Sequence, residues 1–131
     1  MPPIIVNKNI KVCYWNINGI HKRFNGVQRV SLLNKDDCVR VVKNQDIFCF
    51  AETKTNSNEN LDIDGYINKT ICRKRSMRAK LDSGGLALYI KETLTKSITI
   101  IPHTCSEYIW IQINKKKFRL ENYVMLCIYQ P

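Results

Sequence analysis

A short apolar run in this sequence ends in three polar side chains that could do chemistry. The run Ile47–Ala51 is followed directly by a carboxylate, a hydroxyl and an amine, at Glu52, Thr53 and Lys54. Its length and aromatic content predict a strand that is buried on both faces. Ligands of open α/β sheets bind in the crevice beyond the carboxyl ends of the strands, so Glu52 is placed to serve a ligand there. The same residue could also be only the first solvated position after a strand.

A second strand carries amide side chains at its end. The segment 11–20 begins as an apolar strand and changes character at Asn16, after which come Ile17, Asn18 and Gly19. Glycine permits a turn that other residues could not make there. An ordinary turn would use the same residues, because asparagine and glycine are common in turns. Both interpretations place two amides at the carboxyl end of the strand.

A helix is expected between these two strands. Asn34 can act as its N-cap, and the acidic residues that follow suit the positive end of a helix dipole. The order of strand, helix and strand predicts a βαβ-like unit with parallel neighbouring strands. Asn16 and Glu52 would then face each other at one edge. The apolar face of the helix is expected to consist of Cys38, Val41 and Val42.

The rest of the chain favours strands. The polar segment 53–64 predicts a surface loop, and the short β-branched or aromatic segments after it predict one meandering sheet. These segments are Tyr66–Cys72, Leu86–Ile90, Ile98–Ile101, Tyr108–Ile113 and Tyr123–Tyr129. Between the first two lies a basic run that is either a solvated loop or a phosphate-contacting one. Its cationic residues are Arg73, Lys74, Arg75, Arg78 and Lys80.

Composition limits the classes of protein that this chain can belong to. Its 131 residues fit one domain with a real core, preceded by an unpatterned leader at 1–10. The 21 Lys and Arg against 11 Asp and Glu give a formal charge of +10, which favours a polyanionic partner. No apolar stretch is long enough for a membrane span and no signal peptide is evident, so we expect an intracellular protein without a membrane partner. The six cysteines lack the spacing of a zinc site or a disulfide framework.

Four blocks of sequence occur together in a defined order: Tyr14–Ile20, Asp46–Thr53, Ser83–Ile90 and Cys127–Pro131. Within them the chain reads Tyr-Trp-Asn-Ile-Asn-Gly-Ile, Asp-Ile-Phe-Cys-Phe-Ala-Glu-Thr, Ser-Gly-Gly-Leu-Ala-Leu-Tyr-Ile and Cys-Ile-Tyr-Gln-Pro. In these blocks the sequence resembles the endonuclease/exonuclease/phosphatase superfamily, and in detail the apurinic-type endonuclease domain of non-LTR retrotransposons. The resemblance runs from about residue 11 to residue 131, and four ordered blocks are more specific than any one of them.

The resemblance implies a fold and a cofactor. The fold is α/β (mixed α+β), the N-terminal half of a four-layer sandwich of the DNase I-like type, with one mixed β-sheet and a covering helix in residues 11–131. The cofactor is Mg²⁺ or Mn²⁺, which prefers oxygen ligands and neutralises charge on a phosphate during in-line attack. We expect it to bind only in a complete domain. Half of the sandwich is expected to leave the inner face of the sheet open, so we expect residues 1–131 to be poorly soluble or oligomeric.

Several site residues carry over from the resemblance. Glu52 matches the metal-binding glutamate of the family, and Asn16 matches its amide near the metal and the phosphate. Asn18 is a candidate metal ligand where many members have aspartate. Tyr129 matches the tyrosine that contacts the phosphate. The basic residues of 73–80 do not come from the resemblance: their charge alone gives the expectation that they contact DNA.

The resemblance also implies residues that this chain does not contain. The second half of family members supplies further acidic and amide residues and an Asp-His pair that activates water, and neither His21 nor His103 matches that histidine. We therefore expect the isolated chain to be inactive, with its missing half or a reverse transcriptase in a longer parent chain as partners. Three functions remain open at this stage: part of a metal-dependent DNA endonuclease, a non-catalytic basic fragment that binds nucleic acid, and a degenerate product without a role.

Overall fold

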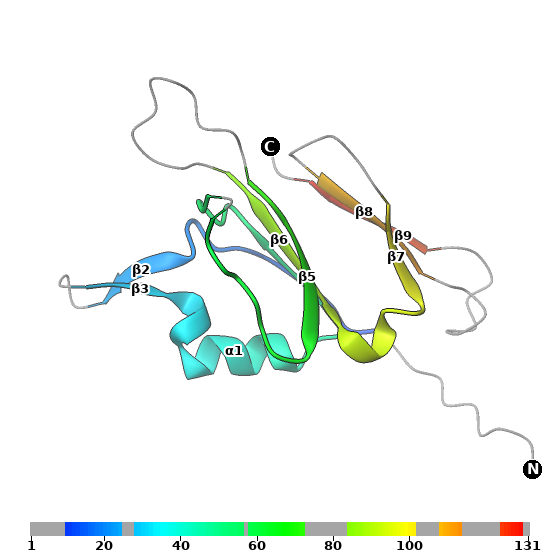
Figure 1. Ribbon diagram of the computed structural model, residues 1–131, viewed down its shortest axis with the longest axis horizontal. Helices are drawn as coiled ribbons and strands as arrows, with labels where there is room; N and C mark the ends of the chain where they lie inside the picture. Colours follow the sequence, from blue (N-terminus) through cyan, green and yellow to red (C-terminus); the bar gives the residue numbers. More distant parts are fainter. Residues whose placement is uncertain are drawn as a thin grey trace, which may run out of the picture.

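The structure is a computed structural model that describes residues 10–24, 28–56, 58–72, 84–101, 108–113 and 124–129, with the backbone alone at 23–24, 28–29 and 124–129. The elements are drawn in Figure 1. In chain order they are β1 (Val12–Asn16), β2 (His21–Phe24), β3 (Gln28–Ser31), the 3₁₀ turn η1 (Leu32–Asn34), α1 (Asp36–Lys43), β4 (Ile47–Ala51), β5 (Tyr66–Ile71), β6 (Leu86–Lys91), the 3₁₀ turn η2 (Glu92–Leu94), β7 (Ile98–Ile101), β8 (Tyr108–Ile113) and β9 (Val124–Tyr129).

A mixed four-stranded sheet forms the centre of the fold. Its strand order is β1-β4-β6-β5, with β1 and β4 parallel and the other neighbours antiparallel. All five residues of β4 are buried, as predicted from a run that is apolar on both faces of the strand. In the parallel pair, Asn16 lies opposite Ala51, so the two strands end together and Glu52 follows at the same edge. The predicted parallel neighbours are therefore confirmed.

Two hydrophobic clusters cover the two faces of this sheet. On one face Phe48, Phe50 and Tyr89 pack with buried residues of α1 and of the segment 61–63. On the other face Cys49 and Leu88 pack against Ile109, Ile111 and Ile113 of β8. The strands β7, β8 and β9 form a second, antiparallel sheet. Helix, four-stranded sheet and three-stranded sheet are thus successive layers (Figure 1).

This architecture confirms the fold class, a mixed α+β fragment of DNase I-like type. Two details of the expectation were wrong. The strands after residue 65 do not form one meander, because β5 and β6 join β1 and β4 while β7 to β9 form the second sheet. The inner face of β4 and β6 is not open, because Ile109 and Ile111 of the second sheet bury it.

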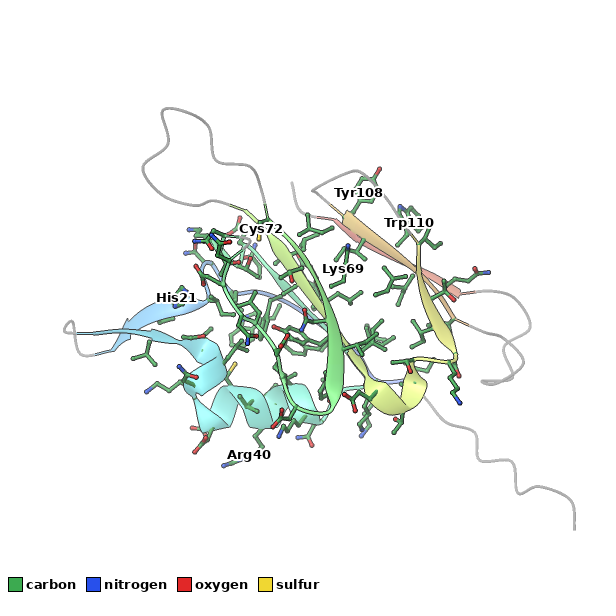
Figure 2. The ribbon with its side chains drawn as sticks, viewed as in Figure 1. His21, Arg40, Lys69, Cys72, Tyr108 and Trp110 are labelled. Carbon is green, nitrogen blue, oxygen red and sulfur yellow. The ribbon has the colours of Figure 1, made fainter. Side chains whose placement is uncertain are left out.

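Helix α1 covers the sheet through a narrower face than expected. Cys38 and Val42 are buried, whereas Val41 is 49% exposed, because it lies about a quarter turn away from Val42. Asn34 is not the N-cap either: it ends η1, and Lys35 precedes the helix without a side-chain capping bond. The exposed Arg40 projects from the outer side of the helix (Figure 2).

A buried tyrosine anchors the end of α1 to the sheet. The hydroxyl of Tyr66 lies 2.6 Å from the carbonyl oxygen of Gln45 and 3.0 Å from that of Val42, so its single hydrogen is shared between two carbonyl groups at the helix end. The helix and the start of β4 are therefore held in place just before the strand that leads to Glu52.

Among the described residues, no helix is both long and apolar enough to span a membrane.

Candidate active site

Three chain segments meet at the edge where β1 and β4 end. The turn after β1 is joined to the segment after β4 by backbone hydrogen bonds from Gly19 to Glu52 at 2.6 Å and from Ile20 to Thr53 at 2.9 Å. The third segment precedes β6: Thr53 donates to Gly85 at 3.3 Å, and Lys54 donates to Gly84 at 2.8 Å. The polar residues 52–54 are therefore fixed between two neighbouring segments.

The backbone at this edge adopts a conformation that L-residues disfavour. Asn18, Glu52 and Lys54 have φ angles of 48°, 53° and 53°, and among the described residues they are the non-glycine positions with positive φ. Left-handed geometry costs roughly 1–2 kcal/mol for a residue with a Cβ atom, although asparagine tolerates it better than most. Such strain clusters at functional sites and persists only where the surroundings enforce it. Here the inter-segment hydrogen bonds enforce it.

A chain of polar contacts links the two amides to Lys54. The side-chain oxygen of Asn16 accepts a hydrogen bond of 3.1 Å from the backbone N–H of Asn18. The side-chain oxygen of Asn18 accepts one of 2.5 Å from the ammonium group of Lys54. In the same turn, Lys22 donates to the backbone carbonyl oxygens of Ile17 and Asn18. Two ammonium groups thus contact the turn, one at a side chain and one at the backbone.

Glu52 lies near a tyrosine of β1. The carboxylate is partly buried at the end of its strand. Burial, and then electrostatic interactions with Cys49 and Glu52, raise the pKa of the Tyr14 phenol. Tyr14, Asn16 and Glu52 therefore belong to one surface around the ends of the two parallel strands.

A buried hydroxyl pair supports the segment that carries Glu52. Thr53 and Thr55 are 0% and 1% exposed, and the Thr55 hydroxyl donates to that of Thr53 at 3.2 Å. A Cβ atom at Gly85 would overlap the Thr53 hydroxyl. Only glycine therefore lets β6 approach this closely. The described residues of the segment 53–64 form a loop as predicted, but the loop is not purely superficial, since Leu61 and Ile63 are also buried.

The structure brings some of the expected site residues together. Asn16, Asn18 and Glu52 lie at one sheet edge. Tyr129 ends β9 opposite Tyr108, in the second sheet, and its side chain is outside the description. The basic residues of 73–80, and His103, lie outside the described residues. His21 lies on β2, where its Nε2 atom is 2.6 Å from Glu59.

Sequence reasoning assigned no role to Lys22 or Lys54, although both hold the turn. A usable signal was present for Lys54, which stands two residues after Glu52 in the same polar group. Lys22 had no comparable signal, because it follows the turn in a mixed basic segment. Its contact with the Asn18 carbonyl forms because the chain continues directly from the turn into β2, which carries Lys22.

The donors at this edge suit a divalent cation in part. Among the described residues, no three His, Cys, Asp or Glu side chains gather as a ready-made metal site. Magnesium, however, is often bound by one or two carboxylates together with water and substrate phosphate, so Glu52 fits. Asn18 fits less well than Glu52, because its side-chain oxygen already accepts a hydrogen bond from Lys54, and a cation at this oxygen would lie beside the positive charge of that ammonium group.

The layered fold, with polar residues at the ends of two parallel strands, defines an α/β sandwich domain with a candidate site at one sheet edge. Within that class the sequence is more specific. Residues 13–124 match the model of the Endonuclease/Exonuclease/phosphatase family, so the chain belongs to this family of nuclease- and phosphatase-type hydrolases. A search of curated proteins gave no match.

Proposed function

We propose that this chain contributes Glu52 and Asn16 to a divalent-metal-dependent phosphodiesterase site that acts on DNA, of the kind found in non-LTR retrotransposon endonucleases. The supporting observation is the parallel pairing of β1 with β4, which places both residues at one edge within the family match. Glu52 would hold Mg²⁺ or Mn²⁺. A bound cation supplies neutralisation of negative charge on the phosphate.

The residues around Glu52 would orient the phosphate. The side-chain oxygen of Asn16 already accepts a bond from Asn18, so the amide NH₂ group is the part that can donate to a phosphate oxygen. An amide does this without adding negative charge beside the carboxylate. Tyr129 would donate a further hydrogen bond to the phosphate, as the family resemblance implies.

The proposed DNA partner agrees with the charge of the chain and with the positions of the described residues that flank the basic run. The chain carries a formal charge of +10. The described residues that flank the basic run, Cys72 and Gly84, adjoin the paired ends of β5 and β6, where Ile71 lies opposite Leu86. Leu86 in turn lies opposite Ala51, next to Glu52. The described residues on either side of the basic run are therefore near the edge that carries the site, which supports the proposal of phosphate contacts there.

Replacement of Glu52 by glutamine tests the metal-dependent function. In the wild-type chain with a short DNA duplex, Mn²⁺ should broaden the backbone amide NMR signals of Asn16, Gly19 and Glu52, because a paramagnetic ion relaxes nearby nuclei. Glu52→Gln should remove most of this broadening and keep cooperative unfolding. The control is Glu92→Gln, an exposed residue at the opposite end of β6, which should behave as wild type. Equal broadening in wild type and Glu52→Gln would contradict the proposal.

A second candidate function is non-catalytic binding of nucleic acid, which the charge of +10 favours. It predicts DNA binding in EDTA and no broadening by Mn²⁺ at Glu52. Nicking of supercoiled DNA separates the two further. Mg²⁺-dependent nicking that Glu52→Gln abolishes would establish the hydrolase function for residues 1–131 alone, against the expectation of an inactive isolated chain.

A further inference from the structure

Lys54 has a more defined position than an exposed lysine usually has. Its aliphatic stem lies over the turn after β1, since a Cβ atom on Gly19 would be 3.6 Å from its Cδ atom. Its ammonium group donates to the side-chain oxygen of Asn18. Lysine side chains at a surface are normally free to rotate, and ordering one costs entropy. Contacts at both the stem and the ammonium group restrict this rotation.

The partner of Lys54 is fixed as well. The backbone N–H of Asn18 donates to Asn16, and the carbonyl oxygen of Asn18 accepts a hydrogen bond of 2.9 Å from Lys22. The backbone of Lys54 is bonded to Gly84 at 2.8 Å. Both ends of the contact between Lys54 and Asn18 are therefore tied to the backbone of the site.

The neutral character of Asn18 decides what this contact can do. An ammonium group has three donors, and the bond to Asn18 uses one of them. A carboxylate in place of Asn18 would neutralise the charge of Lys54, whereas the amide orients the ammonium group and leaves the charge in place. The contact therefore holds the ammonium group of Lys54 in place and leaves two of its N–H donors for a ligand. In the sequence, Lys54 directly follows Thr53 and stands two positions after Glu52.

The geometry points to Lys54 as a phosphate-binding cation of this site, with Asn18 as the residue that positions it and not as a metal ligand. The anion is a phosphate group of nucleic acid, which rests on the proposed function. Lys54 binds the phosphate directly, as lysine does as a point charge in other phosphate sites. Asn18 acts through Lys54. A cation bound at Asn18 instead would meet the ammonium group of Lys54 at close range.

The test measures binding of a short fluorescent DNA duplex in EDTA, so that neither metal binding nor hydrolysis contributes. Lys54→Met should weaken binding about tenfold, the effect of one charge-assisted hydrogen bond, and should lower the salt slope by about 0.9. Lys54→Arg should keep most of both. The control is Lys96→Met, an exposed lysine beyond η2 at the opposite end of the sheet. Equal affinities for Lys54→Met and Lys96→Met would overturn the proposal, as would equal losses in Lys54→Arg and Lys54→Met.

A double-mutant cycle tests the positioning role of Asn18. Asn18→Gly suits the backbone, because glycine adopts positive φ without strain. It should weaken DNA binding in the wild-type background and have little further effect in Lys54→Met, since Asn18 acts through Lys54. A role in stability alone would change the unfolding midpoint and not this coupling. Additive effects on binding would show that Asn18 acts independently, which would overturn its assigned role.

The same measurements distinguish this proposal from the proposed function. Glu52→Gln should bind DNA in EDTA more tightly than the wild type, because it removes a negative charge that repels the phosphate. Loss of binding in Lys54→Met without any Mn²⁺ broadening at Glu52 would support the phosphate site and contradict the metal-dependent function. Mn²⁺ broadening with unchanged binding in Lys54→Met would do the reverse. Inorganic phosphate as a competitor shows whether a free phosphate ion occupies the site as readily as the DNA backbone.

Discussion

The two parallel strands that carry the candidate site differ sharply in burial. All five residues of β4 are buried, between β1 and β6 and between the two hydrophobic clusters. In β1, whose first four residues are also apolar, Val12, Tyr14 and Trp15 are 45%, 47% and 43% exposed. Within the described part of the chain, β1 has one pairing partner. Apolar character alone therefore does not determine burial, because the number of neighbouring strands and covered faces does.

Because of this difference in burial, Glu52 and Asn16 are held in place by different kinds of interaction. Glu52 follows a strand that is packed on every side, so its position is rigid. Asn16 belongs to an edge strand, and its own position depends on hydrogen bonds to the end of β4 and on the turn contacts of Asn18. A site precise enough for catalysis needs rigid support on both sides. Packing gives the β4 side this rigid support. On the β1 side, the contacts of Lys22 and Lys54 give part of it.

The largest expected effect comes from removing an aromatic side chain from each strand. Trp15 and Phe50 are in register, with ring centroids 6.1 Å apart, but Phe50 is fully buried. Phe50→Ala should lower the free energy of unfolding by about 3–5 kcal/mol, because it leaves a cavity against Phe48 and Tyr89. Trp15→Ala should cost roughly half as much or less, because water already reaches the indole. Urea unfolding of both variants measures the difference.

Equal losses in the two variants would break the comparison. They would mean that β1 is as well covered in solution as β4. A concentration-dependent unfolding midpoint in the wild type, absent in Trp15→Ala, would identify a second copy of the chain as the cover, since association makes stability depend on concentration.

The buried strand and its polar end were predictable from the sequence, and the edge position of β1 was not. Ile47–Ala51 is apolar without interruption and is closed by polar residues, so strand, burial and the location of Glu52 followed from the pattern. The second sheet was missed because alternation within strands does not say which strands pair. The N-cap was missed because η1 uses Asn34 before the helix begins. The contact of Lys54 with Asn18 joins residues 36 positions apart, and local patterns carry no information at that separation.

Replacement of two glycines by alanine should have the next largest effects on stability. Gly85 and Gly65 have φ angles of 94° and 86°, so alanine is strained at both. Only at Gly85 would the added methyl group also overlap the Thr53 hydroxyl, behind the segment that carries Glu52. Gly65→Ala should cost about 1 kcal/mol of stability, and Gly85→Ala clearly more. Thermal unfolding of the two variants gives the difference, and equal costs would show that β6 can move away from Thr53 freely.

The smallest expected effect is a pH dependence of the free energy of unfolding, which comes from a thiol in the buried strand. Burial raises the pKa of the Cys49 thiol in β4 from 9.0 to about 12, partly offset by a hydrogen bond with the backbone of Ala87. The unfolded chain therefore loses this proton near pH 9 while the folded chain keeps it. Because the unfolded state then binds fewer protons, stability is fully present below pH 9 and falls as the pH rises toward 12.

Between pH 9 and pH 10 this loss should amount to about 1 kcal/mol from Cys49. Burial also raises the pKa of Cys38 in α1, so the wild type should lose somewhat more. Cys49→Ala should unfold at lower urea concentration than wild type at pH 8 but should lose less stability between pH 9 and pH 10. Ile47→Val, an equally buried position on the same face of β4, is the control: it lowers stability and keeps the wild-type pH slope. If Cys49→Ala also kept that slope, the thiol would already be accessible to hydroxide in the folded state, and β4 would be no better covered than β1.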